Sequence, residues 1–477
     1  MYAFDVATIR DLEARAMAEV GDDTLMQRAA AGLAAAARRM LAARRGSVYG
    51  AQVVIFVGSG NNGGDALFAG ARLARRGARV VAVPCLGAPH PSGLTALLEA
   101  GGRTSTLAEL TLDDIGARPR PHIDLFLDGI LGIGGRAGLT GVPASAAAAM
   151  NRWSIPVLAV DLPSGVEADS GAVPGVAVRA SRTVTFGTYK PCHLVEPARR
   201  LCGEVELVDI GLPEGPEPLL DAMTEDRLYW PGPPSSGDKY ARGVVGVDTG
   251  SDQYPGAGLL STLGTVYGGA GMVRFVGAER PAKLIESHLP NVVFSPGRVQ
   301  AHLFGSGWGE RADGTKVLAA ALDSDLPAVV DADGLKYLPP RVPASWLLTP
   351  HAGELAALLH HERSWVTDDP VRAVREGSEA TGATVLLKGA TQFVASSGRP
   401  VLVALPGPAW TAQAGSGDVL GGVCAALLAA GINARRAGQL AASVQALTAA
   451  RTPGAVPPQD LAREIGRVIG TIAVPDA

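Results

Sequence analysis

Cysteine and histidine are scarce in this chain, which has four cysteines and eight histidines among 477 residues. Cys85, Cys192, Cys202 and Cys424 form no CxxC pair, so the sequence predicts neither a zinc site nor a disulfide framework. Charge of one sign is also lacking, since the formal net charge is only −4. This balance excludes a nucleic-acid footprint and a polybasic membrane anchor. We therefore expect a protein of the reducing cytoplasm that binds neither nucleic acid nor membrane.

Long apolar runs are absent as well. The most apolar late stretch, Val419 to Ala430, spans 12 residues with two glycines, which predicts a buried helix rather than a membrane span. The opening MYAFDVATIRDLEAR lacks the basic and apolar regions of a signal peptide. What is present is a globular composition, with 47% hydrophobic and 18% charged residues. At roughly 100–200 residues per domain, the length predicts two large domains or three small ones.

Strand and helix patterns alternate along the chain, which indicates an α/β fold. Helical spacing covers residues 1–50, and a βαβ unit follows with strands at 53–57 and 79–83. The stretch 211–237 is rich in proline and glycine and interrupts this pattern. We place one domain at 1–212, a linker at 213–224 and a second domain at 225–477. Further strands are predicted at 123–127, 157–160, 183–187, 204–210, 243–248, 272–276, 301–304, 327–331, 346–348, 384–388 and 392–395, and helices at 257–268, 353–360 and 418–430.

Three polar, glycine-rich segments follow strands of the first domain: GSGNNGGD (58–65), DGILGIGGRAGLTG (128–141) and DLPSG (161–165). Ligands of open parallel sheets bind at the carboxyl ends of the strands, so these segments are expected to meet. Glycines allow backbone to approach a ligand, and free N–H groups at a helix start suit phosphate. Each segment alone is also compatible with a tight turn, a flexible connector or an aspartate that caps a turn. Their combination favours a binding site.

The second domain carries a comparable set of strand-end groups. GSGD at 415–418 joins a glycine turn to an apolar helix, where backbone N–H groups stabilise negative charge. Lys388 ends a strand and is one of only six lysines, against 36 arginines. His351 and Glu354 follow the strand at 346–348, and DADGL occupies 331–335. An acidic residue that complements a helix dipole, a solvated lysine and a structural histidine are the simpler interpretations.

GNNGGD, DGILGIGGRAGLTG and DLPSG, in this order, resemble the YjeF N-terminal domain, the NAD(P)HX epimerase, over roughly residues 1–212. The segment TLMQRAAAGLA (24–34) is similar to its opening helix, whereas Ala66 stands where the family usually has glycine. The resemblance implies a Rossmann-like three-layer αβα fold, a catalytic Asp161, and a potassium ion held by Asn62, Asp128 and Ser164. It implies substrate contacts at Asn61, Asn62, Gly63, Gly64, Asp65, Gly132, Ile133, Gly134, Gly135, Arg136, Ala137 and Gly138.

The second half resembles the YjeF C-terminal domain, the ribokinase-like NAD(P)HX dehydratase, over roughly residues 222–477. The similar segments are SGDKYARGVVGVDTGSDQYPGAGLL (236–260), FGSGWG (304–309), DADGL (331–335), TPHAGE (349–354), LKGATQF (387–393) and GPAWTAQAGSGDVLGGV (407–423). Ser306 and Gln392 depart from the proline and threonine that are usual there. The resemblance implies a catalytic Asp418, with dinucleotide contacts at Ala257, Gly307, His351 and Asp418. It implies nucleotide contacts at Lys388, Gly389, Ala390, Thr391, Gln392 and Gly417.

The implied function is metabolite repair. The first domain would interconvert the R and S forms of hydrated NADH and NADPH, and the second would dehydrate the S form while ADP is converted to AMP and phosphate. The Arg- and Ala-rich composition is typical of a bacterial chain, which favours ADP over ATP, with Mg²⁺ bound beside it. We expect a homo-oligomer. The alternatives are a ribokinase-like, vitamin-type kinase in the second half and a non-catalytic nucleotide-binding module in the first.

Overall fold

The computed structural model describes residues 1–112, 123–232 and 238–472, and its chain divides into two compact units. The N-terminal unit is Tyr2–Leu219, and the C-terminal unit comprises Leu220–Ala477 together with Met1. The two units are described separately below. Among the described helices, none has the length and apolar character needed to cross a membrane.

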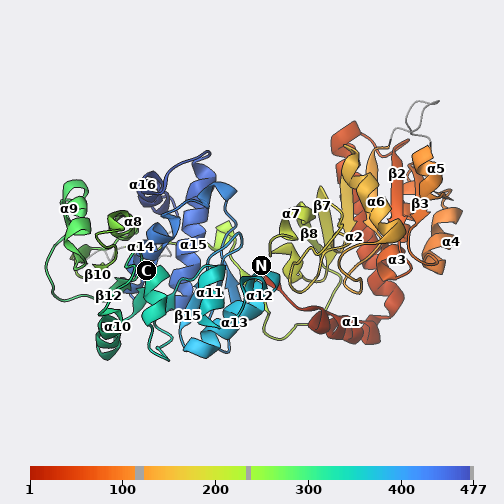
Figure 1. Ribbon diagram of the computed structural model, residues 1–477. Coiled ribbons are helices and arrows are strands. Elements are labelled where there is room, and N and C mark those ends of the chain that lie inside the picture. Colours follow the sequence, from red (N-terminus) through yellow and green to blue (C-terminus); the bar gives the residue numbers. More distant parts are fainter. Residues whose placement is uncertain (113–122, 233–237, 473–477) are drawn as a thin grey trace. The chain divides into compact units, whose positions relative to one another are not determined.

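The N-terminal unit is built on a parallel sheet with strand order β4-β3-β2-β5-β6-β7-β8 (Figure 1). Every strand pair in this sheet is parallel, so the carboxyl ends of the strands share one edge. The strands are β2 (Gln52–Val57), β3 (Arg79–Pro84), β4 (Arg103–Thr104), β5 (Leu125–Gly129), β6 (Val157–Val160), β7 (Arg182–Phe186) and β8 (Glu204–Val208); β1 (Tyr2–Ala3) precedes them. The helices are α1 (Val6–Val20), α2 (Asp22–Arg45), α3 (Asn61–Ala74), α4 (Pro91–Glu99), α5 (Leu107–Leu112), α6 (Gly141–Arg152) and α7 (Arg199–Cys202), with a 3₁₀ turn at Pro191–His193.

Alternating residues of the central strand β2 face two different helical layers. Val53 and Ile55 pack in one core with α2, α3 and α4, whereas Val54 and Phe56 pack in another with α6. Successive side chains of a strand point to opposite faces of its sheet, so a strand buried on both faces reads as a continuous apolar run. Strand β2 is therefore covered by helices on both faces of its sheet, which is the three-layer αβα arrangement that the sequence predicts.

The C-terminal unit contains a larger, mixed sheet, in which its strands follow the order β9-β17-β16-β15-β14-β13-β12-β10-β11. Only β16 runs antiparallel to its neighbours β15 and β17. The strands are β9 (Leu220–Ala222), β10 (Val244–Asp248), β11 (Met272–Phe275), β12 (Ala301–Phe304), β13 (Ala328–Val330), β14 (Leu347–Leu348), β15 (Thr384–Leu387), β16 (Phe393–Ala395) and β17 (Val401–Val403). The helices are α8 (Pro255–Tyr267), α9 (Glu279–His288), α10 (Gly314–Asp323), α11 (Ala352–Leu358), α12 (Arg363–Asp368), α13 (Pro370–Thr381), α14 (Ser416–Ala429), α15 (Ala434–Arg451) and α16 (Pro458–Ile469); 3₁₀ turns occupy Glu225–Arg227, Ala332–Tyr337 and Ala409–Thr411.

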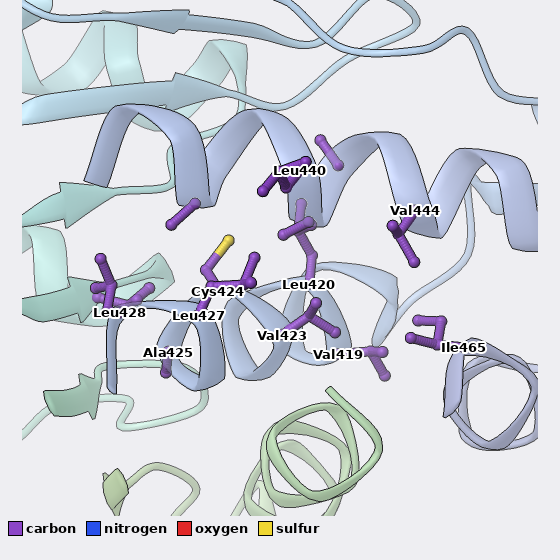
Figure 2. Packing of buried hydrophobic residues seen from close by; sticks show 14 of the residues in the cluster. Val419, Leu420, Val423, Cys424, Ala425, Leu427, Leu428, Leu440, Val444 and Ile465 are labelled. Carbon is purple, nitrogen blue, oxygen red and sulfur yellow. The ribbon is translucent and has the colours of Figure 1, made fainter. Parts of the chain in front are cut away.

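Helix α14 lies inside the core of the C-terminal unit, as its all-round apolar sequence predicts. Every residue from Val419 to Ala429 is buried. Figure 2 shows its side chains between Leu440 and Val444 of α15 and Ile465 of α16. This packing fixes the start of α14, which carries the GSGD segment, against the sheet.

Glycine in α14 allows the backbone of this helix to pack directly against the backbone of α8. A Cβ on Gly422 would lie 2.2 Å from the Ser261 carbonyl oxygen, whereas a Cβ on Gly421 would meet only Leu303 Cδ1, at 3.4 Å. Overpacking of this kind typically costs about 1–3 kcal/mol. We expect Gly422→Ala to lower the free energy of unfolding by at least that amount, measured by denaturant titration. Gly421→Ala is the matched control on the same helix, and an equal loss in both variants would contradict the close-approach argument.

Candidate active sites

The carboxyl edge of the N-terminal sheet borders a cavity of about 600 Å³. Strands β2, β5 and β6 end here in register, with Val57 beside Gly129 and Asp128 beside Ala159. The three predicted segments therefore meet at one edge. The cavity is lined by Arg10, Glu13, Met17, Leu25, Met26, Ala29, Ser59, Gly60, Asn61, Asn62, Asp65, Leu86, Ile130, Leu131, Gly132, Ile133, Gly134, Gly135, Asp161, Phe186 and Ile210.

The GNNGGD segment forms the first turn of α3, and only part of it faces the cavity. Asn61, Asn62 and Asp65 line the cavity, whereas Gly63 and Gly64 are buried behind it. A Cβ on Gly63 would lie 2.3 Å from the Gly58 carbonyl oxygen, so this glycine is required by the tight strand-to-helix turn. The structure thus gives the two glycines a packing role and the three polar residues access to a ligand.

Asp128 and Ser164 do not line the cavity but lie directly behind its wall. The Ser164 hydroxyl donates to Asp128 Oδ1 at 2.6 Å, and the Ser164 N–H donates to Asp128 Oδ2 at 2.8 Å. The Ser164 hydroxyl also accepts the Leu131 N–H at 2.9 Å, which anchors the loop after β5. Burial raises the pKa of Asp128 to about 6, against the lowering effect of its bonds from Ser164 and Ile130.

Asn62 lies beside the loop that Ser164 anchors. A Cβ on Gly132 would be 3.0 Å from Asn62 Oδ1, so the loop passes close to the asparagine side chain. Its Nδ2 atom is buried and has no hydrogen-bond partner among the described residues. Ala66, the departure from the family pattern, fits because residue 129 is glycine, whose Cβ would lie 2.6 Å from the Ala66 side chain.

The glycine-rich loop reaches the cavity with its first half only. Gly132, Ile133, Gly134 and Gly135 line it. Arg136, Ala137 and Gly138 are not among the lining residues. The Gly138 N–H instead donates to the Gly165 carbonyl at 2.9 Å, which closes the far end of the loop onto the DLPSG turn.

Asp161 faces the cavity and is held by groups that the sequence reasoning missed. Lys190 Nζ lies 2.5 Å from Asp161 Oδ1 and also donates to Thr185 Oγ1 and the Phe186 carbonyl. The His193 ring bonds the Asp161 carbonyl oxygen through Nε2 at 2.9 Å and accepts the Lys190 N–H at Nδ1. Burial, followed by the charge of Lys190, lowers the pKa of His193 to about 4, so the ring is neutral. The rarity of lysine in this chain was the available signal for Lys190.

The C-terminal unit has a cavity of about 1130 Å³ beside the ends of β10 and β12. The predicted residues Ala257, Gly307 and Asp418 line it together. A cationic and aromatic group that the prediction omitted also lines it: Arg311 lies 4.4 Å over the Trp308 ring and pairs with Asp248 at 2.7 Å. The full lining is Gly250, Ser251, Asp252, Gln253, Tyr254, Ala257, Val276, Gly277, Ala278, Gly307, Trp308, Gly309, Glu310, Arg311, Asp333, Lys336 and Asp418.

Asp418 belongs to a partly buried cluster with Lys388, Asp331 and Ser306. Lys388 Nζ lies 2.5 Å from Asp331 Oδ1, and the Ser306 hydroxyl donates to Asp331 Oδ2 at 3.2 Å. Burial, reinforced by repulsion from Asp331, raises the pKa of Asp418 to about 7, although Lys388 and a hydrogen bond from Ser306 oppose this shift. Burial tends to lower the pKa of Lys388, but the carboxylates of Asp331, Glu354 and Asp418 together raise it. Asp418 and Lys388 are therefore close neighbours.

Gly417 joins this cluster through its position at the start of α14. A Cβ on Gly417 would lie 3.2 Å from Lys388 Nζ, so this glycine keeps the lysine beside the helix N-terminus. The preceding Gly415 is the N-cap residue, with a left-handed φ of 92° that favours glycine. These two glycines place the GSGD backbone and Lys388 side by side.

His351 is not part of the large cavity and has a clear structural role. Its Nδ1 accepts the N–H groups of Gly353 and Glu354, and Glu354 returns a bond to the His351 N–H, which forms a capping box for α11. The His351 backbone forms a bridge with Lys388, so it is adjacent to the cluster nonetheless. Gly389 and Ala390 are exposed beyond Lys388, and Thr391 and Gln392 are half-buried. Of the similar segment 236–260, Ser236 and Gly237 lie outside the described residues.

Comparison with known proteins assigns both units. A family model described as the YjeF-related protein N-terminus matches residues 22–192, and one described as NAD(P)H-hydrate dehydratase matches residues 245–469. The bifunctional NAD(P)H-hydrate repair enzyme Nnr of Mycobacterium leprae is 42% identical over 484 residues, which covers 98% of this chain and 98% of that protein. The chain belongs to the family of bifunctional NAD(P)H-hydrate repair enzymes.

A further sequence relative agrees with this assignment. The enzyme of the same name from Mycobacterium tuberculosis strain H37Rv is 44% identical over 444 residues, covering 90% of this chain and 89% of that protein. A solved structure of an ADP/ATP-dependent NAD(P)H-hydrate dehydratase from Bacillus subtilis, co-crystallised with ATP and Mg²⁺, is 22% identical, with a TM-score of 0.49. The match covers 52% of this chain and 97% of the Bacillus subtilis chain.

Membership of the repair family confirms the predicted α/β class, with a Rossmann-like N-terminal and a ribokinase-like C-terminal fold. It also favours metabolite repair over both alternatives, the vitamin-type kinase and the non-catalytic N-terminal module, because the match to bifunctional enzymes extends through both halves.

Proposed function

We propose that this chain epimerises hydrated NADH and NADPH at ring carbon C6 and dehydrates the S epimer, with conversion of ADP to AMP and phosphate. Residues 1–212 would carry the epimerase and residues 225–477 the dehydratase, with 213–224 between them; strand β9 lies within this last segment. The observation that supports the proposal most is that each unit has one cavity lined by a family-typical aspartate, Asp161 in one and Asp418 in the other.

The epimerase proposal assigns proton transfer to Asp161. The C6 hydroxyl of the substrate is next to the ring nitrogen, so its C–O bond breaks readily once the oxygen is protonated. Re-addition of water to the other face inverts the centre. The Lys190 ammonium, 2.5 Å away, compensates the Asp161 charge and fixes the carboxylate at the cavity wall. Asn61, Asn62, Asp65 and the loop residues 132–135 would hold the substrate, and Gly63, Gly64 and residues 136–138 would support them from behind.

A potassium ion fits the group behind the wall of this cavity. Asp128 is fully buried, and no cationic side chain pairs with it among the described residues. Hard cations prefer carboxylate, hydroxyl and amide oxygens, and Asp128, Ser164 and Asn62 would supply these. Such an ion would supply positive charge near the substrate; Asp128 and Ser164 would hold the loop from Ile130 onward in place.

The dehydratase proposal assigns base catalysis to Asp418. Hydroxide is a poor leaving group, so the C6 hydroxyl first attacks the terminal phosphoryl group of ADP as Asp418 takes its proton. The backbone N–H groups of GSGD and the Lys388 ammonium stabilise the charge that develops on the phosphoryl oxygens. Phosphate then leaves, driven by the ring nitrogen, and loss of a proton from ring carbon C5 forms the C5–C6 double bond and restores the reduced nicotinamide. Ala257, Gly307 and the adjacent His351 would contact the substrate.

The nucleotide would lie along Lys388, Gly417 and the segment 389–392. Magnesium usually binds through nucleotide phosphates and water with few protein ligands. This fits the described residues, in which no group of three His, Cys, Asp or Glu could hold a metal. A magnesium ion would supply charge neutralisation to the phosphates, and Lys388 would add a fixed cation beside it. ADP as the preferred nucleotide, a homo-oligomeric state and a cytoplasmic location remain predictions.

The decisive experiment incubates the full chain with hydrated NADH and either ADP or ATP, in potassium buffer. We expect NADH absorbance to recover with one phosphate released per NADH, faster with ADP, and both epimers to be consumed. Consumption of only the S epimer, with the R epimer left unchanged, would refute the epimerase proposal, and a phosphorylated product would restore the kinase alternative. Replacing potassium by choline should slow epimerisation and leave dehydration of the S epimer unchanged.

A further inference from the structure

Helix α1 contributes a second carboxylate to the epimerase cavity, and it lies outside the matched family region at 22–192. Ile9, Leu12 and Ala16 are the buried residues of α1. Arg10, Glu13 and Met17 line the cavity, and their spacing of three and four residues places them along one face of the helix. The helix start is fixed by Asp5, which accepts the Thr8 N–H at 2.7 Å. Glu13 is therefore held at the cavity by the local fold.

The surroundings of Glu13 differ from those of Asp161. Asp161 is in direct contact with the Lys190 ammonium, whereas Glu13 makes no ion pair among the described side chains. Burial, followed by repulsion from Asp161, raises the pKa of Glu13, while Lys190 and Arg10 act in the opposite direction. The other titratable groups of this region are Asp65, which lines the cavity, and the neutral His193 behind Asp161. Two carboxyl groups in one cavity are thus held in different environments, which is typical of an acid and base pair.

We infer that Glu13 is a second proton-transfer group of the epimerase and works as the partner of Asp161. The inference rests on the proposed epimerase function. Glu13 in its acid form gives its proton to the C6 hydroxyl, the C6–O bond breaks with its electron pair leaving on water, and the ring-nitrogen lone pair forms the C6–N double bond. Water then adds to the opposite face of C6, the double-bond pair returns to nitrogen, and Asp161 accepts the proton that the added water loses.

This scheme balances and is reversible. One proton leaves Glu13 and one reaches Asp161, no electrons are exchanged with another molecule, and the substrate differs only in configuration. With a substrate of the opposite configuration, the same steps occur in reverse, so Asp161 loses its proton and Glu13 regains one. Proton exchange with solvent restores the two groups in the same way. The oxygen on C6 is replaced in each turnover, so epimerisation in ¹⁸O-water should label the hydroxyl.

The test compares Glu13→Gln and Glu13→Asp in the full chain, with purified R epimer and no ADP, so that only epimerisation is followed. We expect Glu13→Gln to slow epimerisation and ¹⁸O incorporation at least about 100-fold with KM unchanged, because general acid catalysis contributes about 10²–10⁴-fold. Glu13→Asp keeps a carboxyl group and should retain more activity than Glu13→Gln. A packing role would give the reverse order, since glutamine preserves the size of the side chain. Wild-type rate should fall as pH rises past the raised pKa of Glu13, and this decline should be absent in Glu13→Gln.

Glu19→Gln, on the exposed end of the same helix, is the matched control and should behave as wild type. Glu13→Gln activity within threefold of wild type, or a glutamine variant more active than the aspartate variant, would overturn the assignment of Glu13. Failure of the wild-type chain to interconvert the epimers would instead overturn the epimerase function itself. Thermal unfolding of each variant identifies any loss that comes from misfolding.

Discussion

Asp418→Asn should reduce ADP-dependent dehydration of the S epimer by about 10²–10⁴-fold, the usual contribution of a general base. The substitution keeps the shape of the side chain but removes the group that takes the C6 hydroxyl proton. Asp418 lines the cavity of the C-terminal unit, and asparagine preserves the shape of this lining, so substrate should still bind. The loss should therefore appear in kcat rather than KM. Epimerisation should be unchanged. The measurement is NADH recovery and phosphate release at saturating nucleotide.

The pH dependence of the dehydration rate is a second, independent test of Asp418 as the general base. Its pKa is raised to about 7 by burial and by Asp331, and a base must be ionised to act. Wild-type dehydration should therefore increase as pH rises through about 7, and this increase should be absent in Asp418→Asn. Asp460→Asn is the matched control, because Asp460 is also a first-turn aspartate, on α16, but does not line the cavity. An equal loss of activity in both variants would reduce Asp418 to a residue that complements a helix dipole.

Asp161→Asn should abolish epimerisation to a similar extent, about 10²–10⁴-fold, while binding of hydrated NADH is retained. An amide cannot take up the proton lost by the added water. It also removes the charge that pairs with Lys190 Nζ at 2.5 Å, which leaves a buried ammonium with only Thr185 and Phe186 as neutral partners. The assay follows conversion of purified R epimer to S without ADP, and dehydration of S epimer should proceed at the wild-type rate.

Asp124→Asn separates loss of chemistry from loss of stability in the same unit. Asp124 is also buried and paired, with Arg45 at 3.0 Å, but it precedes β5 and so lies at the amino edge of the sheet. We expect this variant to unfold at lower temperature and to keep its epimerase rate at assay temperature. Full epimerase activity in Asp161→Asn would refute the role of Asp161, and equal inactivation by Asp124→Asn would attribute both effects to unfolding.

Several parts of the fold were predictable because they depend on local sequence. The continuous apolar run at 53–57 and the glycine-rich turn after it are sufficient to indicate a buried parallel strand followed by a helix. The short strands β9 and β17 were missed because three residues carry no readable period and their pairing partners lie far away in the chain. Helix α15 was also missed, since Ala, Gly and Gln residues in its buried face give little apolar contrast.

The sequence by itself determined the family, the α/β class and the acids at the strand ends, because close backbone approach requires glycine at particular positions and such motifs are local. Only the tertiary structure decided which groups surround those acids. Lys190 and Glu13 are 29 and 148 residues from Asp161 in the chain, and both come to it through packing of α1 and the segment after β7. Charge interactions depend on distance in space and on burial, neither of which can be read from distance along the chain.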